Sequence, residues 1–474
     1  MSGIVGFFNV KEKIMNSQEI LMNMNNKLMH RGSDKDGYYI GDNIALGFRT
    51  ILCGDNQPIS FNFEGNTYVI VYDGNIYNLK ELKLELEQYD FCFSTNSDAE
   101  VILKGYIHFR ESFVNKLNGV FAFAIFDQNQ NSLFIARDHF GIKPFYYTII
   151  NNTFVFASEI KALFQFPNVN PKMDSMGICE LIGIGPAHTP GVTVFKDIYE
   201  IKPAHYGIYN DGGFHSKSYW KLISKPHTDS LGKTCETIKY LLEDSIKKQL
   251  VSDLPVCSFL SGGLDSSIIS LYAANYYKLN DLKPLDTYSV DYVDNDKNFV
   301  KSDFQPNSDN YYIELMSKRL YSEHHNIVLD TPELADTLEA AMIARDVPGM
   351  ADIDSSLLLF CKNVKPEASI ALTGECADEI FAGYPWFFRE DALSSNTFPW
   401  SIAIQERQTL LNNQISEKVD LKAYIDYRYN ESLSEVEILD SDSPETAEKR
   451  KISHLTLNWF MQTLLDRSDR MAMY

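Results

Sequence analysis

The chain changes character near residue 205, and this change limits the folds that it can adopt. Before it, runs rich in Val, Ile, Phe and Tyr are separated by Gly, Asn and Asp turns, which is typical of a sheet-rich domain with few helices. After it, short apolar runs alternate with helical stretches such as 233–250, which is typical of an α/β domain. We therefore expect one domain over 1–205 and another over 206–474. The strand-like runs of the first half are 66–74, 120–127, 132–138 and 152–158.

Four apolar runs of the second half have the length and composition of buried parallel strands. They are 254–260, 285–292, 323–329 and 368–374. The polar stretch 293–310 lies between two of them, and we expect it to be a long loop or an insertion. Because ligands bind at the carboxyl ends of parallel strands, motifs that follow these runs are candidates for a common site.

The overall composition argues against several functional classes. The 474 residues include 43 Lys and Arg against 64 Asp and Glu, a net charge of −21, which disfavours non-specific binding to nucleic acid and to anionic membranes. We find no run of 18 apolar residues and no leader-like N-terminus, and we expect a cytoplasmic protein. The cysteines form no CxxC pair and no zinc-spaced cluster with His, so we expect reduced, mostly buried thiols. They are residues 53, 92, 179, 235, 257, 361 and 376.

The sequence SGGLDSS at 261–267 lies between the apolar run 254–260 and a helix-like stretch, 268–277. A strand, a glycine turn and a helix N-terminus place backbone N–H groups around a phosphate. The serines add hydroxyl donors, and Asp265 would hold a magnesium ion that bridges phosphate oxygens. No GKS or GKT follows, so this is not a Walker A loop. An ordinary Gly/Ser turn that caps a helix is the alternative.

A second motif, TGECADEIFAGY at 373–384, also follows an apolar run, so it would face 261–267 across a crevice. Its three neighbouring carboxylates would repel one another unless a cation or a positive substrate lies between them. We expect Asp378 to share a magnesium ion with Asp265, and Glu375 to act in acid/base chemistry. A DE pair that caps a helix is the simpler alternative.

The N-terminus offers a separate candidate. Residues 3–8, GIVGFF, predict a buried strand that holds Ser2 rigidly. A Ser or Cys that becomes the first residue after removal of Met can act as a nucleophile, with its own α-amino group as the base. Ser2 is therefore a candidate nucleophile, provided that Met1 is removed.

Together these motifs resemble the class B asparagine synthetase family. In the second half the resemblance rests on SGGLDSS, on TGECADE with FAGY, and on LLDRSDRMAM at 464–473. In the first half HRGSDKDG (30–37) is similar to the family's HRGPDxxG, YDGNIYN (72–78) to its NGEIYN, and SDAEVIL (97–103) to its SDTEVIL. The motifs cover nearly the whole chain in the family's order. Further similar segments are 47–60, 119–127, 137–147 and 156–163.

The resemblance implies an α+β N-terminal-nucleophile glutaminase sandwich, with helices around two sheets (αββα). It is followed by an α/β ATP pyrophosphatase-type domain of the adenine nucleotide alpha hydrolase-like kind. The implied reaction uses ATP and Mg²⁺: aspartate attacks the α-phosphorus to give β-aspartyl-AMP and pyrophosphate, and ammonia, free or carried from glutamine through a tunnel, displaces AMP. An acyl adenylate must be kept from water, which suits a closed site. The implied partners are small molecules, and we also expect a homodimer.

The resemblance also implies roles for residues. Arg49 would pair with the α-carboxylate of glutamine, for which a bidentate Arg is suited, and Asp98 would take the α-ammonium. The catalytic set is Ser2, Asp73, Gly74 and Glu375. The glutamine-binding set is Arg49, Asp73, Gly74, Asn75 and Asp98. The ATP-binding set is Leu260, Ser261, Gly262, Gly263, Asp265, Ser266, Val290, Thr373 and Gly374, and the metal ligands are Asp265 and Asp378.

Three residues of the first domain depart from the family pattern. Ser2 stands where glutamine-dependent members carry Cys, and a hydroxyl is far less ionised than a thiol near neutral pH. Asp73 replaces the Asn whose amide belongs to the oxyanion hole, and removing one such donor costs about 2.7–4 kcal/mol. Asn75 replaces the Glu that helps to hold the ammonium group. We predict weak or absent glutaminase activity; drift in a domain kept only for folding is the alternative.

The second domain departs as well. In 344–360, where the family reads roughly DEPxxDPSxxPxYLL, Val347 replaces the acid, and Asp352 and Asp354 are new carboxylates. They are either solvated loop residues or groups that recognise a different, cationic acceptor. Cys376 replaces a glycine, for which we have no physical account. The chain stops inside a motif that family members continue, so we expect a truncated C-terminus, without the later lysine that supports pyrophosphate formation.

The leading hypothesis is an ATP-dependent carbon–nitrogen ligase that amidates aspartate, with an impaired glutaminase. The first alternative is a β-lactam synthetase-like or other amide ligase, with a different carboxylate acceptor and a non-functional glutaminase domain. The second is a regulator that only binds glutamine or a nucleotide. Asp265, Glu375 and Asp378 argue against a regulator, because a protein that only binds needs no magnesium-organised cleavage site.

Overall fold

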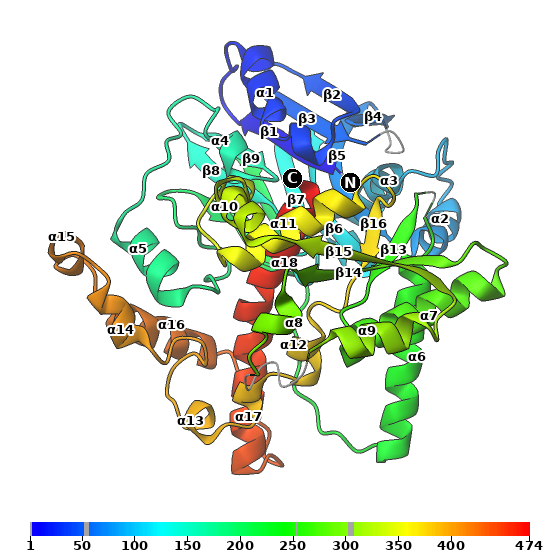
Figure 1. Ribbon diagram of the computed structural model, residues 1–474. Helices are drawn as coiled ribbons and strands as arrows, with labels where there is room; N and C mark the ends of the chain where they lie inside the picture. The colour runs from blue at the N-terminus through cyan, green and yellow to red at the C-terminus, as the bar shows by residue number, and fades with distance from the viewer. Residues whose placement is uncertain (1, 52–55, 253, 302–307) are drawn as a thin grey trace.

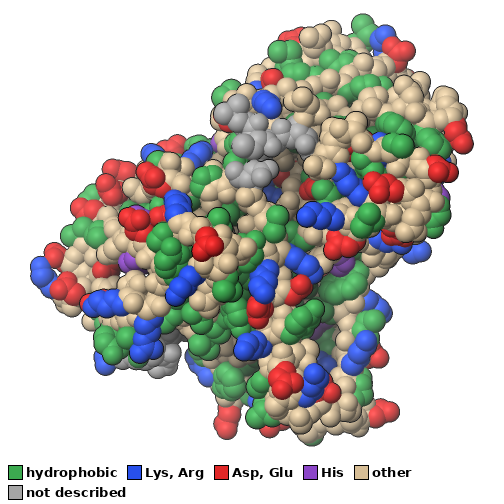
Figure 2. Space-filling view, turned by 90° about the vertical axis from the view of Figure 1, so that its right-hand side faces the viewer, with side chains coloured by type: hydrophobic (Ala, Val, Ile, Leu, Met, Phe, Trp, Pro, Cys, Tyr) green, Lys and Arg blue, Asp and Glu red, His purple; other side chains and the backbone are tan. Residues whose placement is uncertain are grey.

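Figure 1 shows the computed structural model, which describes residues 2–51, 56–252, 254–301 and 308–474. Met1, Cys53 and residues 302–307 of the predicted loop lie outside the described residues. No helix within the described ranges is long and apolar enough to cross a membrane. On the face shown in Figure 2, Lys and Arg side chains are interspersed with Asp and Glu, so no basic patch for nucleic acid is present on that face.

The first half of the chain forms two six-stranded sheets. The first sheet has the order β10 (Tyr199–Glu200), β8 (Tyr146–Ile150), β9 (Thr153–Ala157), β1 (Ser2–Asn9), β3 (Ile44–Thr50) and β2 (Lys35–Ile40). The second has the order β12 (Gly213–Ser218), β11 (His205–Asn210), β7 (Ser132–Arg137), β6 (Gly119–Asp127), β5 (Asn66–Ile76) and β4 (Ile59–Phe63). The strands predicted at 66–74, 120–127, 132–138 and 152–158 are confirmed, as is the strand that begins at Ser2.

Alternating apolar residues hold the two sheets face to face. In β1, Ile4 and Phe8 point into the core between the sheets, whereas Val5 and Phe7 pack against helix α1 (Ser17–Asn26) on the outer side. The outer side of the second sheet is covered by α2 (Leu79–Glu87) and α3 (Asp98–Phe109). The layers are therefore helix, sheet, sheet and helix, which confirms the predicted αββα sandwich.

The second half contains a four-stranded parallel sheet in the order β15 (Ser322–Leu329), β14 (Leu285–Tyr292), β13 (Val256–Phe259) and β16 (Ile370–Leu372). All four predicted parallel strands are confirmed. Helices α6 (Leu231–Gln249) and α7 (Leu264–Leu279) pack on one face of this sheet, and α11 (Asp352–Val364) packs on the other. This is the predicted α/β architecture.

The expected boundary at 205/206 stays a prediction. Strand β11 spans that position and pairs with β7 of the first domain, and β12, which follows it, pairs with β11. The remaining helices of the described residues are α4 (Ile160–Leu163), α5 (Ser175–Ile178), α8 (Asn295–Asn298), α9 (Asn310–Ser317), α10 (Thr331–Arg345), α12 (Ala377–Phe381), α13 (Glu390–Leu393), α14 (Ile404–Thr409), α15 (Asn413–Ser416), α16 (Leu421–Leu433), α17 (Pro444–Leu455) and α18 (Met461–Met473).

The two domains meet along α18, which runs through the middle of the molecule in Figure 1. Arg31 is at the centre of this contact, because its Nη1 and Nη2 donate to the two carboxylate oxygens of Asp469 at 2.6 and 3.0 Å. Its Nη1 also donates to Glu159 at 3.0 Å. Burial alone would lower the pKa of Arg31, but Asp469, Glu159 and Asp73 raise it overall. Arg31 is therefore a fully buried cation that depends on acids from both domains.

Arg470, the next residue of α18, extends this contact. Its Nη1 lies 3.1 Å from Asp346 and 3.3 Å from Glu159, and its Nε lies 3.2 Å from Asp466. Tyr146 of the first domain donates to Asp466 at 3.2 Å. We call this group the interdomain ion cluster; its members are Arg31, Glu159, Lys161, Asp346, Asp466, Asp469 and Arg470.

We predict that Asp469→Asn destabilises the protein by about 3–5 kcal/mol, because it leaves a buried guanidinium without its bidentate acid. The measurement is the free energy of unfolding from urea titration. Asp352→Asn, at an exposed position of α11, is the matched control and should change this free energy by less than about 0.5 kcal/mol. Equal values for the two variants would contradict the assigned role of Asp469.

The same cluster predicts a loss of stability in acid. Burial alone would raise the pKa of Asp469, yet Arg31 and Lys143 lower it overall, and Arg470 lowers those of Asp466 and Glu159 in the same way. Such carboxylates stabilise the fold above their ordinary pKa of about 4 and lose this contribution as the pH falls through the lowered value.

Wild-type protein should therefore lose stability steeply below about pH 4, and Asp469→Asn should show a shallower slope. Asp346 opposes this trend weakly, because burial raises its pKa. Urea midpoints measured between pH 3 and 7 test the prediction, and parallel curves for the two proteins would count against it.

Candidate active sites

The first candidate site lies at the start of β1, where Ser2 is only 7% exposed. Its hydroxyl donates to Oδ1 of Asp73, on β5, at 2.6 Å, and Asp73 is 1% exposed. The structure thus brings together two of the residues at which the sequence departs from the family. A carboxylate can only accept hydrogen bonds, so Asp73 cannot supply the donor that an oxyanion hole requires.

Two cations lie beside Asp73. Arg31 Nη2 donates to its Oδ2 at 3.3 Å, and Lys143 Nζ lies 3.9 Å from its Oδ1. Arg31 Nε also donates to the carbonyl oxygen of Ser2 at 3.1 Å. The pair of Ser2 and Asp73 is therefore joined directly to the interdomain ion cluster. Both carboxylate oxygens of Asp73 thus have partners, and its negative charge helps to compensate Arg31 and Lys143.

The predicted glutamine-binding residues surround this pair. Arg49 is opposite Gly3 in the pairing of β1 with β3, and it donates to the carbonyl of Asn25 at 2.8 Å and to the side chain of Asn26 at 2.7 Å. Gly74 has φ +157°, and a Cβ there would lie 2.1 Å from the carbonyl oxygen of Val120, so only glycine fits.

Asp98 begins α3 and faces the same strand. Its Oδ2 accepts from the backbone N–H of Ile76 and from the hydroxyl of Tyr72, both at 2.8 Å. Burial and then Asp98 raise the pKa of Tyr72 well above its ordinary value. Asn75 lies beside these residues on β5 and is exposed. The roles of these residues in binding glutamine stay predictions.

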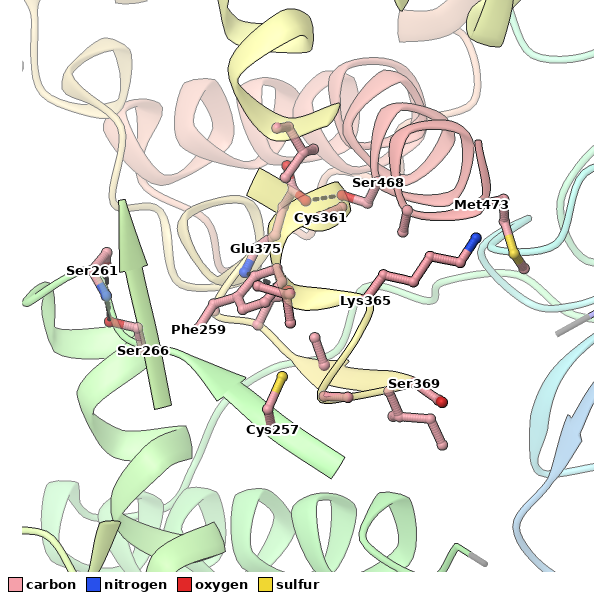
Figure 3. A pocket seen from close by; sticks show the side chains of 18 of the residues that line it. Cys257, Phe259, Ser261, Ser266, Cys361, Lys365, Ser369, Glu375, Ser468 and Met473 are labelled. Atoms are coloured by element: carbon pink, nitrogen blue, oxygen red, sulfur yellow. Dashed lines mark hydrogen bonds between the residues drawn. The ribbon is translucent and has the colours of Figure 1, made fainter. Parts of the chain in front are cut away.

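The second candidate site is a cavity of about 650 Å³ at the carboxyl ends of β13 and β16, shown in Figure 3. The two sequence motifs of the second domain meet on its wall, as the ends of parallel strands require. Leu260, Gly262 and Val290 of the predicted ATP-binding set are absent from the described lining. The predicted residues that line it are Ser261, Gly263, Asp265, Ser266, Thr373, Gly374, Glu375 and Asp378.

The SGGLDSS loop has the geometry expected of an anion-binding turn. Gly262 has φ +80°, and α7 begins directly after Gly263. The hydroxyl of Ser266 accepts from the backbone N–H of Ser261 at 3.1 Å, which closes the turn. A Cβ at Gly374 would lie 2.8 Å from the backbone nitrogen of Ser266, so the second motif packs directly onto the first.

The acidic groups of the cavity suit a hard cation. Burial raises the pKa of Asp265, and the charge of Asp378 raises it further; burial also raises the pKa of Asp378. No group of three or more metal-binding side chains occurs within the described ranges. Mg²⁺ fits this donor set nonetheless, because proteins often hold it by one or two carboxylates together with phosphate oxygens and water.

Glu375 is held by α18. The hydroxyl of Ser468 and the guanidinium of Arg467 both donate to its carboxylate, and Figure 3 shows the contact with Ser468. Burial raises the pKa of Glu375, although Arg467 opposes the shift. Arg467 and Ser468 belong to the motif at 464–473, but the sequence alone indicates no role for either residue. Neither charge nor spacing reveals which residue of a distant helix will face a given glutamate.

Lys365 is a further residue that the sequence did not single out. It follows α11, lines the cavity, and extends toward Met473 in Figure 3.

Cys376 has φ +71°, a left-handed conformation that glycine adopts more easily than cysteine. Glycine, which the family carries at this position, adopts this conformation without strain. Its replacement by Cys therefore strains the backbone, and we identify no contact of the Cys376 side chain that compensates for this.

Two expectations about individual residues are corrected. Asp354 is not a solvated loop residue: it is 2% exposed, and its Oδ2 accepts from Arg345 at 3.2 Å, so it is a buried partner of an arginine. Asp352, by contrast, is exposed.

The described cysteines are free, as predicted, but they are not mostly buried. Cys179 and Cys257 are buried, Cys361 and Cys376 are intermediate, and Cys92 and Cys235 are exposed.

The αββα sandwich buries the residue at position 2, and the parallel-sheet domain joined to it brings two loop motifs onto one cavity. This combination is typical of two-domain amidotransferase ligases. Residues 1–220 match the family described as "Glutamine amidotransferase domain", and residues 237–474 match the family described as "Asparagine synthase". The chain belongs to the asparagine synthase family, which confirms the resemblance found in its motifs.

Individual relatives agree with this assignment. The chain is 42% identical to "Asparagine synthetase [glutamine-hydrolyzing] 3" of Bacillus subtilis, over 100% of this chain and 77% of that protein. It is 34% identical to "Asparagine synthetase [glutamine-hydrolyzing] 1" of the same organism, over 81% of this chain and 59% of that protein. Among solved structures, glutamine phosphoribosylpyrophosphate amidotransferase of B. subtilis aligns with a TM-score of 0.36 at 16% identity, over 69% of this chain and 81% of that one, which is too remote to bear on the fold.

Ser2→Ala tests whether the pair of Ser2 and Asp73 is a structural unit. The change leaves a buried carboxylate without one donor, so we expect a loss of about 1–3 kcal/mol in the free energy of unfolding. Ser33→Ala is a matched control, because Ser33 donates to Asp34 at the same 2.6 Å but on the surface. The control should lose less than about 0.5 kcal/mol. A Ser2→Ala protein as stable as Ser33→Ala would show that the buried bond is dispensable.

Proposed function

We propose that the protein is an ATP-dependent ligase that converts aspartate into asparagine, with AMP and pyrophosphate as the other products. The observation that carries this proposal is the meeting of the SGGLDSS and TGECADE motifs in one cavity. There Asp265, Asp378 and Glu375 line the same wall as the anion-binding turn. The relatives named above, which carry the name asparagine synthetase, support aspartate as the acceptor.

The backbone N–H groups of 261–266 and the N-terminus of α7 would bind the phosphates that leave as pyrophosphate. Asp265 and Asp378 would hold Mg²⁺, which neutralises charge on the phosphate oxygens when it is bound. The side-chain carboxylate of aspartate attacks the α-phosphorus of ATP, and the bond from that phosphorus to the pyrophosphate oxygen breaks. The product of this step is an acyl adenylate.

Ammonia then attacks the acyl carbon, and the bond to the AMP oxygen breaks. Glu375 would accept the proton that the attacking nitrogen loses, and the rise of its pKa on burial supports this role. Arg467 and Ser468 hold its carboxylate in place. The walls of the cavity keep the adenylate from water. A regulator that only binds a nucleotide has no use for this arrangement.

We further propose that this chain uses ammonium better than glutamine. Three contacts of the first site support this: the hydroxyl of Ser2 is bonded to Asp73, a carboxylate stands where the oxyanion donor is expected, and Arg31 pairs with that carboxylate. A pocket arranged in this way is poorly suited to stabilise a tetrahedral oxyanion. The β-lactam synthetase-like alternative has no support among the relatives named above, and the homodimer stays a prediction.

The test is pyrophosphate release from ATP and Mg²⁺ with aspartate, with asparagine identified by mass. We expect the rate with saturating ammonium to exceed the rate with saturating glutamine by about 100-fold or more, the cost of losing one oxyanion donor. The variant Ser2→Cys/Asp73→Asn/Asn75→Glu should recover glutamine-dependent synthesis without a large change in the ammonium rate.

The outcomes separate the two proposals. Equal rates of the wild type with glutamine and with ammonium would overturn the proposed impairment of the first site. Absence of asparagine with either nitrogen source, in a protein that still releases pyrophosphate with another carboxylate, would overturn aspartate as the acceptor.

A further inference from the structure

A second cavity, of about 610 Å³, lies between the two domains. The first domain contributes residues such as Tyr146 and Ile160, and the second contributes residues such as Arg345 and Met350. None of its described lining residues lines the cavity of the second active site. Residues 463 and 466 of α18 face this cavity and residues 468 and 472 face the other, so the helix separates the two.

The walls of this interdomain cavity combine apolar side chains with acids that already have partners. Glu200 is paired with Arg137 at 3.0 Å, and Asp466 with Arg345 at 3.3 Å. Glu180 accepts from the backbone and hydroxyl of Thr189 at 3.0 and 2.6 Å. Each carboxylate is thus neutralised or hydrogen-bonded in place. The apolar lining residues include Ile160, Leu181, Val192, Met350, Ile353 and Leu410.

One cation of the lining differs from these acids. The guanidinium of Arg407 donates only to backbone carbonyls, including those of Gly183 at 3.1 Å and Trp400 at 2.7 Å, and no carboxylate of the described residues pairs with it. Burial lowers the pKa of Arg407, in keeping with the lack of an acidic partner. An anion inside the cavity would compensate that charge.

Arg345 supplies a second, independent observation. It is 7% exposed, and its Nε makes no hydrogen bond within the described part of the chain, although its other nitrogens bond to Asp354, Thr463 and Asp466. A buried N–H without an acceptor is costly, and such groups normally find a partner or a ligand. This Nε is sealed from the cavity, so a ligand would reach it only after the Arg345 side chain moved, and Arg407 is the cation of the lining that is open to an anion.

We propose that the interdomain cavity binds a small organic carboxylate with an apolar body. The carboxylate would pair with Arg407, and the apolar body would lie against the aliphatic walls. Because both domains supply the walls, such a ligand would favour the domain arrangement seen here. Met350 also contacts Arg467, with its sulfur 3.5 Å from Nη1, and Arg467 holds Glu375, so two residues, Met350 and Arg467, would connect the bound ligand to Glu375 of the second active site.

The test uses 3-phenylpropanoate as the probe and 3-phenylpropan-1-ol as its neutral counterpart. Isothermal titration calorimetry on the full chain measures binding, and a thermal scan measures the shift in Tm. We expect saturable binding of the carboxylate with a rise in Tm, and at least tenfold weaker binding of the alcohol. Arg407→Gln should weaken binding of the carboxylate at least tenfold, whereas Arg319→Gln, at an exposed arginine, should leave it unchanged.

A cavity-filling variant guards against a loss of folding in Arg407→Gln. Val192 lines the cavity and is half-buried, so the added ring of Val192→Phe should occupy the space of the ligand without touching Arg407. It should abolish binding of 3-phenylpropanoate. Binding that persists in Val192→Phe, binding of the alcohol as tight as that of the carboxylate, or unchanged affinity in Arg407→Gln would each overturn the proposal.

Discussion

The arrangement of this protein depends on one buried guanidinium. Arg31 comes from the first domain, bonds in bidentate fashion to Asp469 of α18, and also touches Glu159, Asp73 and the carbonyl of Ser2. A charge removed from water in this way is tolerated only when its partners remain in place. The position of α18 against the first domain therefore depends on these hydrogen bonds. Because α18 lines both cavities, the shape of their walls depends on the same bonds.

This dependence changes how the departures at Ser2 and Asp73 are understood. An Asn at position 73 would offer Arg31 no negative charge, whereas the carboxylate serves both the arginine and the hydroxyl of Ser2. The two changes are complementary: the hydroxyl is a donor, and the acid accepts it. Asp73 also helps to hold Arg31, which in turn bonds to Asp469 of the second domain, so random drift is the weaker account of these residues.

Periodicity and turn residues were enough to predict the main strands from the sequence, whereas the order of the layers in the first domain came from the resemblance to the family. The runs 254–260 and 285–292 are strands because they are short, apolar and bounded by turns, and the loop at 261–267 lies where such strands end. The motifs also predicted that 373–384 faces 261–267 across a crevice, and residues of both motifs do line one cavity. Asp354 and the Arg467 contact could not be predicted, because both depend on which side chains of distant helices meet after packing, and local patterns carry no information about that.

The helix α18 serves three neighbours at once. Thr463 and Asp466 line one cavity, Ser468 holds Glu375 at the other, and Asp469 and Arg470 complete the ion cluster. Each residue turns about 100° around the helix axis from the one before it, so a single inserted or deleted residue within Met461–Met473 would misdirect all three sets together. Evolution can exchange side chains along this helix one at a time, but it cannot change the helix's length there by one residue, and variation in length among homologues must be confined to the loops outside it.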